Sequence, residues 1–207
     1  RYIDLRGSIR ANTRNGGEII QLRWRSRKTK PRPRVVICDI TGSMDPYSRL
    51  FLHFIHSLSQ DVRQVEAFAF CTRLTRLTPA LRHSDVDTAV DKISDLVVDW
   101  SGGTRIGESL KHFNYHWSRR VLGWGATVLI ISDGWERGDL ILLDKEMDRL
   151  RRSAYRLLWL NPLAGSPGYQ PLVGGIKTAL PYCDEFLPLH NLHSLEQVVS
   201  RLGAVTL

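Results

Sequence analysis

The chain has 207 residues, of which 43% are hydrophobic and 24% are charged, and its formal net charge is +8. This length suits one sizeable globular domain, or a domain with an appendage. No uninterrupted apolar run approaches the roughly 18 residues of a membrane-spanning helix, and no secretory h-region opens the chain. Because it begins at Arg1, we expect it to be a piece of a longer protein.

The positive charge is concentrated at the N-terminal end. Residues 1–34 hold 11 Lys and Arg against 2 Asp and Glu, a net of +9, whereas the other 173 residues hold 18 against 19, a net of −1. Such a basic arm suits contact with nucleic acid, anionic lipid or an acidic protein surface, and a solvated arm is the alternative. Its basic residues after position 20 are Arg23, Arg25, Arg27, Lys28, Lys30, Arg32 and Arg34.

The three cysteines, Cys38, Cys71 and Cys183, have no C-x-x-C spacing. Cys38 lies in an apolar run and Cys71 follows "AFAF", which is typical of small buried thiols. Unpaired cysteines fit a reducing cytoplasm, so we expect the protein to lie in the cytoplasm or at the inner face of its membrane.

Expected strands and helices alternate along most of the chain. After a possible strand at 18–26, β-branched and apolar runs predict strands at 34–38, 64–70, 72–78, 126–131, 155–161 and 184–189. Apolar residues at helical spacing predict helices at 48–60, 84–100, 108–122, 142–153 and 194–202, with a loop and a short helix within 167–183. This alternation predicts an α/β fold, a doubly wound and mostly parallel sheet flanked by helices. We expect a domain over 34–207 and a basic extension, a hairpin or linker, over 1–33.

Oxygen-bearing side chains lie in three of the segments that connect the expected strands and helices. "DITGS" after the first buried strand gives Asp39, Thr41 and Ser43, "SGGT" before a helix gives Thr104, and "SDG" gives Asp133. In a doubly wound sheet the carboxyl ends of the strands bind ligands, and carboxylate and hydroxyl oxygens suit Mg²⁺. Each residue alone is better explained as a helix cap or a turn residue, but all three segments in this order at strand ends favour a metal site.

These residues carry a family resemblance. "DITGSM … SGGT … ISDG" resembles the metal-ion-dependent adhesion site (MIDAS) of von Willebrand factor A domains, D-x-S-x-S … T … D, with Thr41 in place of the usual first serine. A resemblance to the CoxE-like branch of that family extends over most of the chain. It is carried by the segments "RNGGEIIQLRWRSRKTKPRPRVVICDITGSMDPYSR", "DWSGGTRIGESL", "LIISDGWERGD", "RRSAYRLLWLNPLAG" and "FLPLHNLHSLE".

The resemblance implies a role for each residue. Thr41, Ser43 and Thr104 would ligate Mg²⁺, with Mn²⁺ or Ca²⁺ as alternatives, and Asp39 and Asp133 would reach it directly or through water. One position would stay open for a carboxylate of a partner protein. The resemblance further implies a MoxR-type AAA+ ATPase as partner and a client metalloenzyme, namely carbon monoxide dehydrogenase and its molybdenum–copper centre.

The residues that follow this site have the composition of an interaction surface. Trp135, Glu136, Arg137 and Asp139, together with Arg105, would form a partner-binding rim, although Trp135 could instead pack under its own loop.

Enzymatic alternatives fit less well. An aspartate-nucleophile phosphatase needs D-x-D, and Thr41 stands where its acid should be. No phosphate-binding G-x-x-x-x-G-K-[ST] loop is present in the sequence. His112 and His116 have the spacing of a zinc-ligand pair, but Phe113 and Trp117 beside them favour surface or boundary packing. The pairs His53 with His56 and His190 with His193 are read in the same way.

Overall fold

The computed structural model describes residues 2–13, 21–25, 32–61, 65–82, 88–89, 92–93, 103–123 and 125–203, except for the side chains at 43, 45–46, 48–49 and 59–61. Contacts divide the chain into two compact units, Arg1–Lys30 with Thr206–Leu207, and Pro31–Val205. The helix predicted at 84–100 lies mostly outside the described residues.

The N-terminal unit is held together by polar contacts. It contains strand β1 (Tyr2–Ile3), helix α1 (Leu5–Asn12) and strand β2 (Trp24–Arg25), and the two strands pair antiparallel. Ser8 and Asn12 are its buried helical residues: Ser8 Oγ accepts the Arg23 N–H at 2.8 Å, and the Asn12 amide donates to Gln21 O at 2.8 Å. Apolar side chains of the unit are exposed instead, namely Tyr2, Ile3, Leu5, Ile9, Leu22 and Trp24.

The larger unit is built on a six-stranded sheet in the order β5-β4-β3-β6-β7-β8. All neighbours are parallel except β4 and β5, which confirms the predicted fold class. The chain passes outward from β3 through β4 to β5 and returns to β6 on the other side of β3. The carboxyl ends of β3 and β6 therefore flank the point where strand order reverses, where α/β folds bind ligands. The strands are β3 (Arg34–Asp39), β4 (Val65–Phe70), β5 (Leu74–Arg76), β6 (Thr127–Ile131), β7 (Arg156–Asn161) and β8 (Glu185–Pro188).

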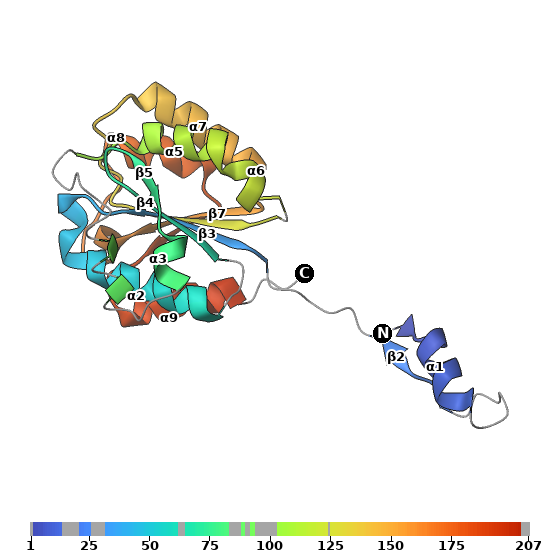
Figure 1. Cartoon of the computed structure of the whole chain (residues 1–207). Coiled ribbons are helices and arrows are strands. Elements are labelled where there is room, and N and C mark those ends of the chain that lie inside the picture. Colours follow the sequence, from blue (N-terminus) through green and yellow to red (C-terminus); the bar gives the residue numbers. More distant parts are fainter. Residues whose placement is uncertain are drawn as a thin grey trace. The chain divides into compact units, whose positions relative to one another are not determined.

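Helices cover both faces of this sheet (Figure 1). On one face lie α2 (Asp45–Asp61), α3 (Thr78–Arg82) and α9 (Leu192–Gly203), and on the other α5 (Ile106–His116), α6 (Ser118–Val121), α7 (Leu140–Ser153) and α8 (Gly174–Ala179). Short 3₁₀ helices span Gly42–Met44, Pro162–Gly165 and Leu180–Tyr182. No helix among the described residues is long and apolar enough to cross a membrane.

Alternation along β3 explains why it is apolar on both sides. Val36 and Cys38 pack into the cluster under α2 and α9, while Val35 and Ile37 pack into the cluster under α5 and α7. A strand buried on both faces ends abruptly when its last residue, Asp39, brings a carboxylate to the edge of the sheet.

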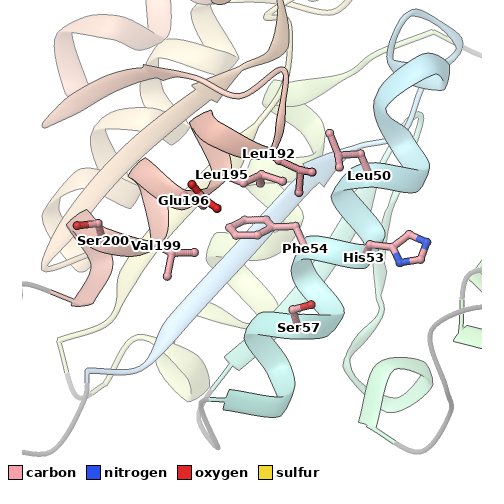
Figure 2. A pocket seen from close by; sticks show the side chains of 9 residues that line it. All are labelled: Leu50, His53, Phe54, Ser57, Leu192, Leu195, Glu196, Val199 and Ser200. Carbon is pink, nitrogen blue, oxygen red and sulfur yellow. The ribbon is translucent and has the colours of Figure 1, made fainter.

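An apolar groove of about 460 Å³ separates α2 from α9 (Figure 2). Leu50 and Phe54 line it from α2, and Leu192, Leu195 and Val199 line it from α9. Leu192 is 72% exposed, so the groove opens to solvent.

Candidate metal site

The site starts at the carboxyl end of β3. Asp39 is fully buried, and its Oδ1 accepts hydrogen bonds from the Thr41 backbone N–H at 3.0 Å and from Thr41 Oγ1 at 2.7 Å. The aspartate therefore folds the chain back on itself as it leaves the sheet, which fixes the Thr41 hydroxyl beside the carboxylate.

A second hydroxyl comes from the segment that leads into α5. Thr104 Oγ1 lies 2.9 Å from Thr41 Oγ1. Because the Thr41 hydroxyl proton is donated to Asp39, Thr104 is the donor in this pair. The backbone just before Thr104 favours glycine, because φ at Gly103 is +82° and a Cβ there would come within 2.6 Å of the Arg137 side chain.

The third segment follows β6. Ser132 Oγ donates to the other carboxylate oxygen of Asp39, Oδ2, at 2.8 Å, and so joins the two strand ends. Asp133 is 2% exposed, and its Oδ1 accepts the Trp135 N–H at 3.0 Å. From β7, the Asn161 amide donates to the Asp133 carbonyl oxygen at 3.2 Å and holds this loop in place.

The two carboxylates give the site an unbalanced negative charge. Burial, the largest cause, and the nearby Asp133 carboxylate raise the pKa of Asp39 to about 7, although hydrogen bonds from Thr41 and Ser132 lower it. A cation placed between the two groups would relieve both the desolvation and the repulsion.

The donor set fits a hard divalent cation. Ligands at right angles around Mg²⁺, each about 2.1 Å from the ion, stand about 3.0 Å apart. The two threonine hydroxyls, at 2.9 Å, already have that separation. Among the described residues no group of three or more His, Cys, Asp or Glu converges, so hydroxyls and two carboxylates are what the site offers. That chemistry suits Mg²⁺ better than a soft metal.

Four of the five predicted ligands lie in this cluster, namely Asp39, Thr41, Thr104 and Asp133, while the side chain of Ser43 is outside the described set. The sequence reasoning missed Ser132 and Asn161. Both carried a signal, since each is a polar residue at the carboxyl end of a buried strand.

Of the predicted rim residues, Trp135 is exposed, whereas Glu136 and Asp139 cap helices. Trp135 is 56% exposed and does not pack under its own loop. Glu136 is half-buried and accepts the Gly107 N–H at 2.9 Å, so it caps α5, and burial is the main cause that raises its pKa. Asp139 caps α7 by accepting the Ile141 N–H at 2.9 Å.

The remaining rim residues are arginines. Arg137 is exposed at its side chain, while its N–H donates to Thr104 O at 3.0 Å. Arg105 pairs with Glu108 at 3.1 Å on the surface. Partner binding by the rim stays a prediction.

Residues of the basic arm occupy different places. Arg23 and Arg25 are exposed in the N-terminal unit, where Arg25 lies 3.5 Å from Asp4. Arg32 stacks on the Tyr155 ring, 3.6 Å from its centroid, and Arg34 begins β3. Arg27, Lys28 and Lys30 lie outside the described residues.

The paired histidines also differ from one another. His112 and His116 are exposed with ring centroids 4.5 Å apart, and desolvation followed by the charge of His116 lowers the pKa of His112. His56 is buried, and the ring of His190 contacts Asn191 at 3.0 Å.

An open, mostly parallel sheet with hydroxyls and carboxylates gathered at its switch point defines the class of von Willebrand factor A domains. Solved structures of that class match the chain: a von Willebrand factor type A protein from Catenulispora acidiphila (TM-score 0.57, 12% identity, 84% of this chain and 42% of that one) and the SpRpn10 VWA domain (0.52, 12%, 83% and 95%). Proximal thread matrix protein 1 from the mussel byssus, solved with a zinc-occupied MIDAS motif, matches with TM-score 0.54 and 14% identity over 83% of this chain and 46% of that one. These identities show the fold alone.

The family is given by sequence. The model of the family described as VWA domain containing CoxE-like protein matches residues 1–195, so the chain belongs to that family. The chain spans less than half the length of the mussel and Catenulispora chains. A comparison with curated proteins finds no match.

Proposed function

We propose that the chain is a non-enzymatic adaptor that captures a partner protein through a divalent cation at the β3–β6 edge. It would work with a MoxR-type AAA+ ATPase in the cytoplasm, in the maturation of a client metalloenzyme. By family resemblance, the client is carbon monoxide dehydrogenase with its molybdenum–copper centre.

The observation that carries the proposal is the Thr41–Thr104 hydroxyl pair at 2.9 Å beside the buried Asp39. The hydroxyl ligands are neutral, so a divalent ion that Asp39 and Asp133 reach only through water would have no charged group among its direct ligands. When bound, the cation supplies a coordination position that an Asp or Glu of a partner can fill, and that contact is strengthened by charge.

The same geometry argues against hydrolysis. Metal-assisted hydrolysis needs a general base next to an activated water. Both oxygens of Asp39 already accept hydrogen bonds, from Thr41 and Ser132, and no second acid stands at position 41 for phosphatase chemistry. What these residues can do is hold an ion and present it.

The test is capture of the AAA+ ATPase by the full chain, with Mg²⁺ and with EDTA. We expect capture that EDTA abolishes and that Thr104→Val weakens at least tenfold. Thr178→Val is a matched control, because the Thr178 hydroxyl donates an exposed hydrogen bond to Gly174 O in its own helix, at 2.9 Å. Equal capture with EDTA, or by Thr104→Val, would contradict the proposal.

A second candidate function rests on the N-terminal unit. Its exposed apolar side chains, Leu5 and Ile9, share α1 with the exposed Arg6 and Arg10, a combination found in segments that bind anionic surfaces. Binding of this kind to anionic lipid or nucleic acid would weaken steeply with salt and ignore EDTA, the opposite of metal-bridged capture.

A further inference from the structure

Helix α5 carries a second pair of metal-ligating side chains, away from the hydroxyl site. We propose that His112 and His116 chelate one divalent transition-metal ion, of the class Cu²⁺, Ni²⁺ or Zn²⁺, in the pocket at the α5–α7 surface. The pocket has a volume of about 520 Å³ and is lined by Glu108, Lys111, His112, Tyr115, His116 and Leu142.

The geometry of the two rings fits a shared ion. Residues four apart on a helix stand on one face, one turn above the other. With metal–nitrogen distances of about 2.0–2.1 Å, two imidazoles bound at right angles, as in the square-planar geometry of Cu²⁺ or Ni²⁺, place their centroids about 4.5 Å apart. The rings of His112 and His116 have centroids 4.5 Å apart.

Both rings are also available. His112 and His116 are exposed, and within the part of the chain that the structure describes no hydrogen bond or ion pair engages either one. Other histidines are committed elsewhere: His190 contacts Asn191 at 3.0 Å, and His193 contacts Gln197 at 3.0 Å. Unlike these two histidines, His112 and His116 are therefore not engaged by a neighbouring polar group among the described residues.

The ligand class follows from the donors. Imidazole nitrogen suits Zn, Cu and Ni, with Cu²⁺ at the head of the affinity order, whereas Mg²⁺ prefers oxygen. Glu108 stands one further turn toward the start of α5, where it pairs with Arg105 at 3.1 Å and is not one of the proposed ligands. No third acidic, cysteine or histidine group converges with the pair in the described chain, so water completes the shell. The nearby Lys111 charge lowers the affinity, which makes this a weaker site than a four-ligand structural zinc centre.

The two metal sites are separable by position. Thr104 precedes α5, and His112 and His116 lie six and ten residues beyond its first residue, Ile106, which is about 9 Å and about 15 Å along the helix axis. Loss of the hydroxyl site therefore leaves the histidine pair in place.

The experiment is a titration of the full chain with Ni²⁺ and Cu²⁺ in excess Mg²⁺, followed by calorimetry and by electron paramagnetic resonance for Cu²⁺. We expect the wild type to bind one more equivalent than His112→Ala/His116→Ala, with two coordinated nitrogens in the Cu²⁺ spectrum, and each single variant to bind at least tenfold more weakly. His193→Ala, which removes a histidine that is 77% exposed at its side chain, is the matched control and should keep the site.

Three outcomes would overturn the assignment: equal stoichiometry and affinity in the double variant, no binding to the wild type, or loss of the equivalent in His193→Ala. Alanine is the best helix former and both positions are exposed, so circular dichroism and melting should show all variants folded. Thr104→Val should keep the equivalent, which separates this site from the one in the proposed function.

Discussion

Thr104→Val removes one hydroxyl and keeps the shape of the side chain. The hydroxyl of Thr104 has one described partner, Thr41 Oγ1 at 2.9 Å, and Thr41 keeps its own bond to Asp39 after the substitution. Without metal, the loss is one neutral hydrogen bond at a residue that is 4% exposed, so we expect the free energy of unfolding to fall by about 1 kcal/mol.

With metal, the same substitution removes a ligand. Substitutions that only disturb the partners of ligands typically cost about 10–100-fold in metal affinity, so loss of the ligand itself should cost at least tenfold. At a Mg²⁺ concentration about 100 times the wild-type Kd, bound ion stabilises the fold by about 2.7 kcal/mol, and a tenfold weaker site leaves about 1.4 kcal/mol.

The assay is denaturant unfolding of wild type, Thr104→Val and Thr178→Val, each with Mg²⁺ and with EDTA. The quantity to compare is the gain from Mg²⁺, that is, the free energy of unfolding with Mg²⁺ minus that with EDTA. This difference does not contain the metal-free cost of the substitution. Thr178→Val should keep the whole gain. If Thr104→Val keeps it as well, Thr104 is not a ligand and the hydroxyl pair has only a structural role.

Three further variants probe the loops around the site. Gly103→Ala should lower the free energy of unfolding by about 1–2 kcal/mol, measured in urea, because φ at 103 is +82° and the new Cβ meets Arg137; an unchanged midpoint would contradict the strain argument. Trp135→Ala should change stability by less than about 0.5 kcal/mol, since the residue is 56% exposed, but weaken capture of the ATPase by about 30-fold or more. Leu172→Ala, at a residue that is 62% exposed, should not weaken capture. Glu136→Gln should change how stability depends on pH: the folded pKa of Glu136 is raised, so the contribution of Glu136 to wild-type stability is fully present below the ordinary pKa of 4.5 and is lost as pH rises through the folded value. As pH rises, the free energy of unfolding of the wild type should therefore fall relative to that of Glu136→Gln. Parallel profiles of unfolding free energy against pH would refute this.

The sheet could be predicted because its strands are buried on both faces. The apolar run before Asp39 pairs with Val65–Phe70 on one side and with Thr127–Ile131 on the other, so its sequence has little choice but an interior strand. Helix α1 was missed for the opposite reason: it buries Ser8 and Asn12 and exposes Leu5 and Ile9, so its apolar residues do not mark its inner face.

The candidate site was predicted as far as side-chain type allows. Asp39, Thr41 and Asp133 could be predicted because each lies at the end of a buried strand or within two residues of it. What the pattern could not supply was which polar groups support these residues: Glu136 was read as a rim residue, yet its carboxylate reaches back to the Gly107 N–H. Such a contact joins segments 29 residues apart and depends on how the loops cross, not on local spacing.

The loops around the carboxyl ends of β3 and β6 are tied together by bonds that need no ion. Ser132 bridges to Asp39, and the Arg137 N–H bonds to the Thr104 carbonyl. An arriving cation therefore meets donors that are already assembled, so little ordering entropy opposes its capture. By the same reasoning, severing one of these bridges would reduce metal affinity even though every ligand remained in the sequence.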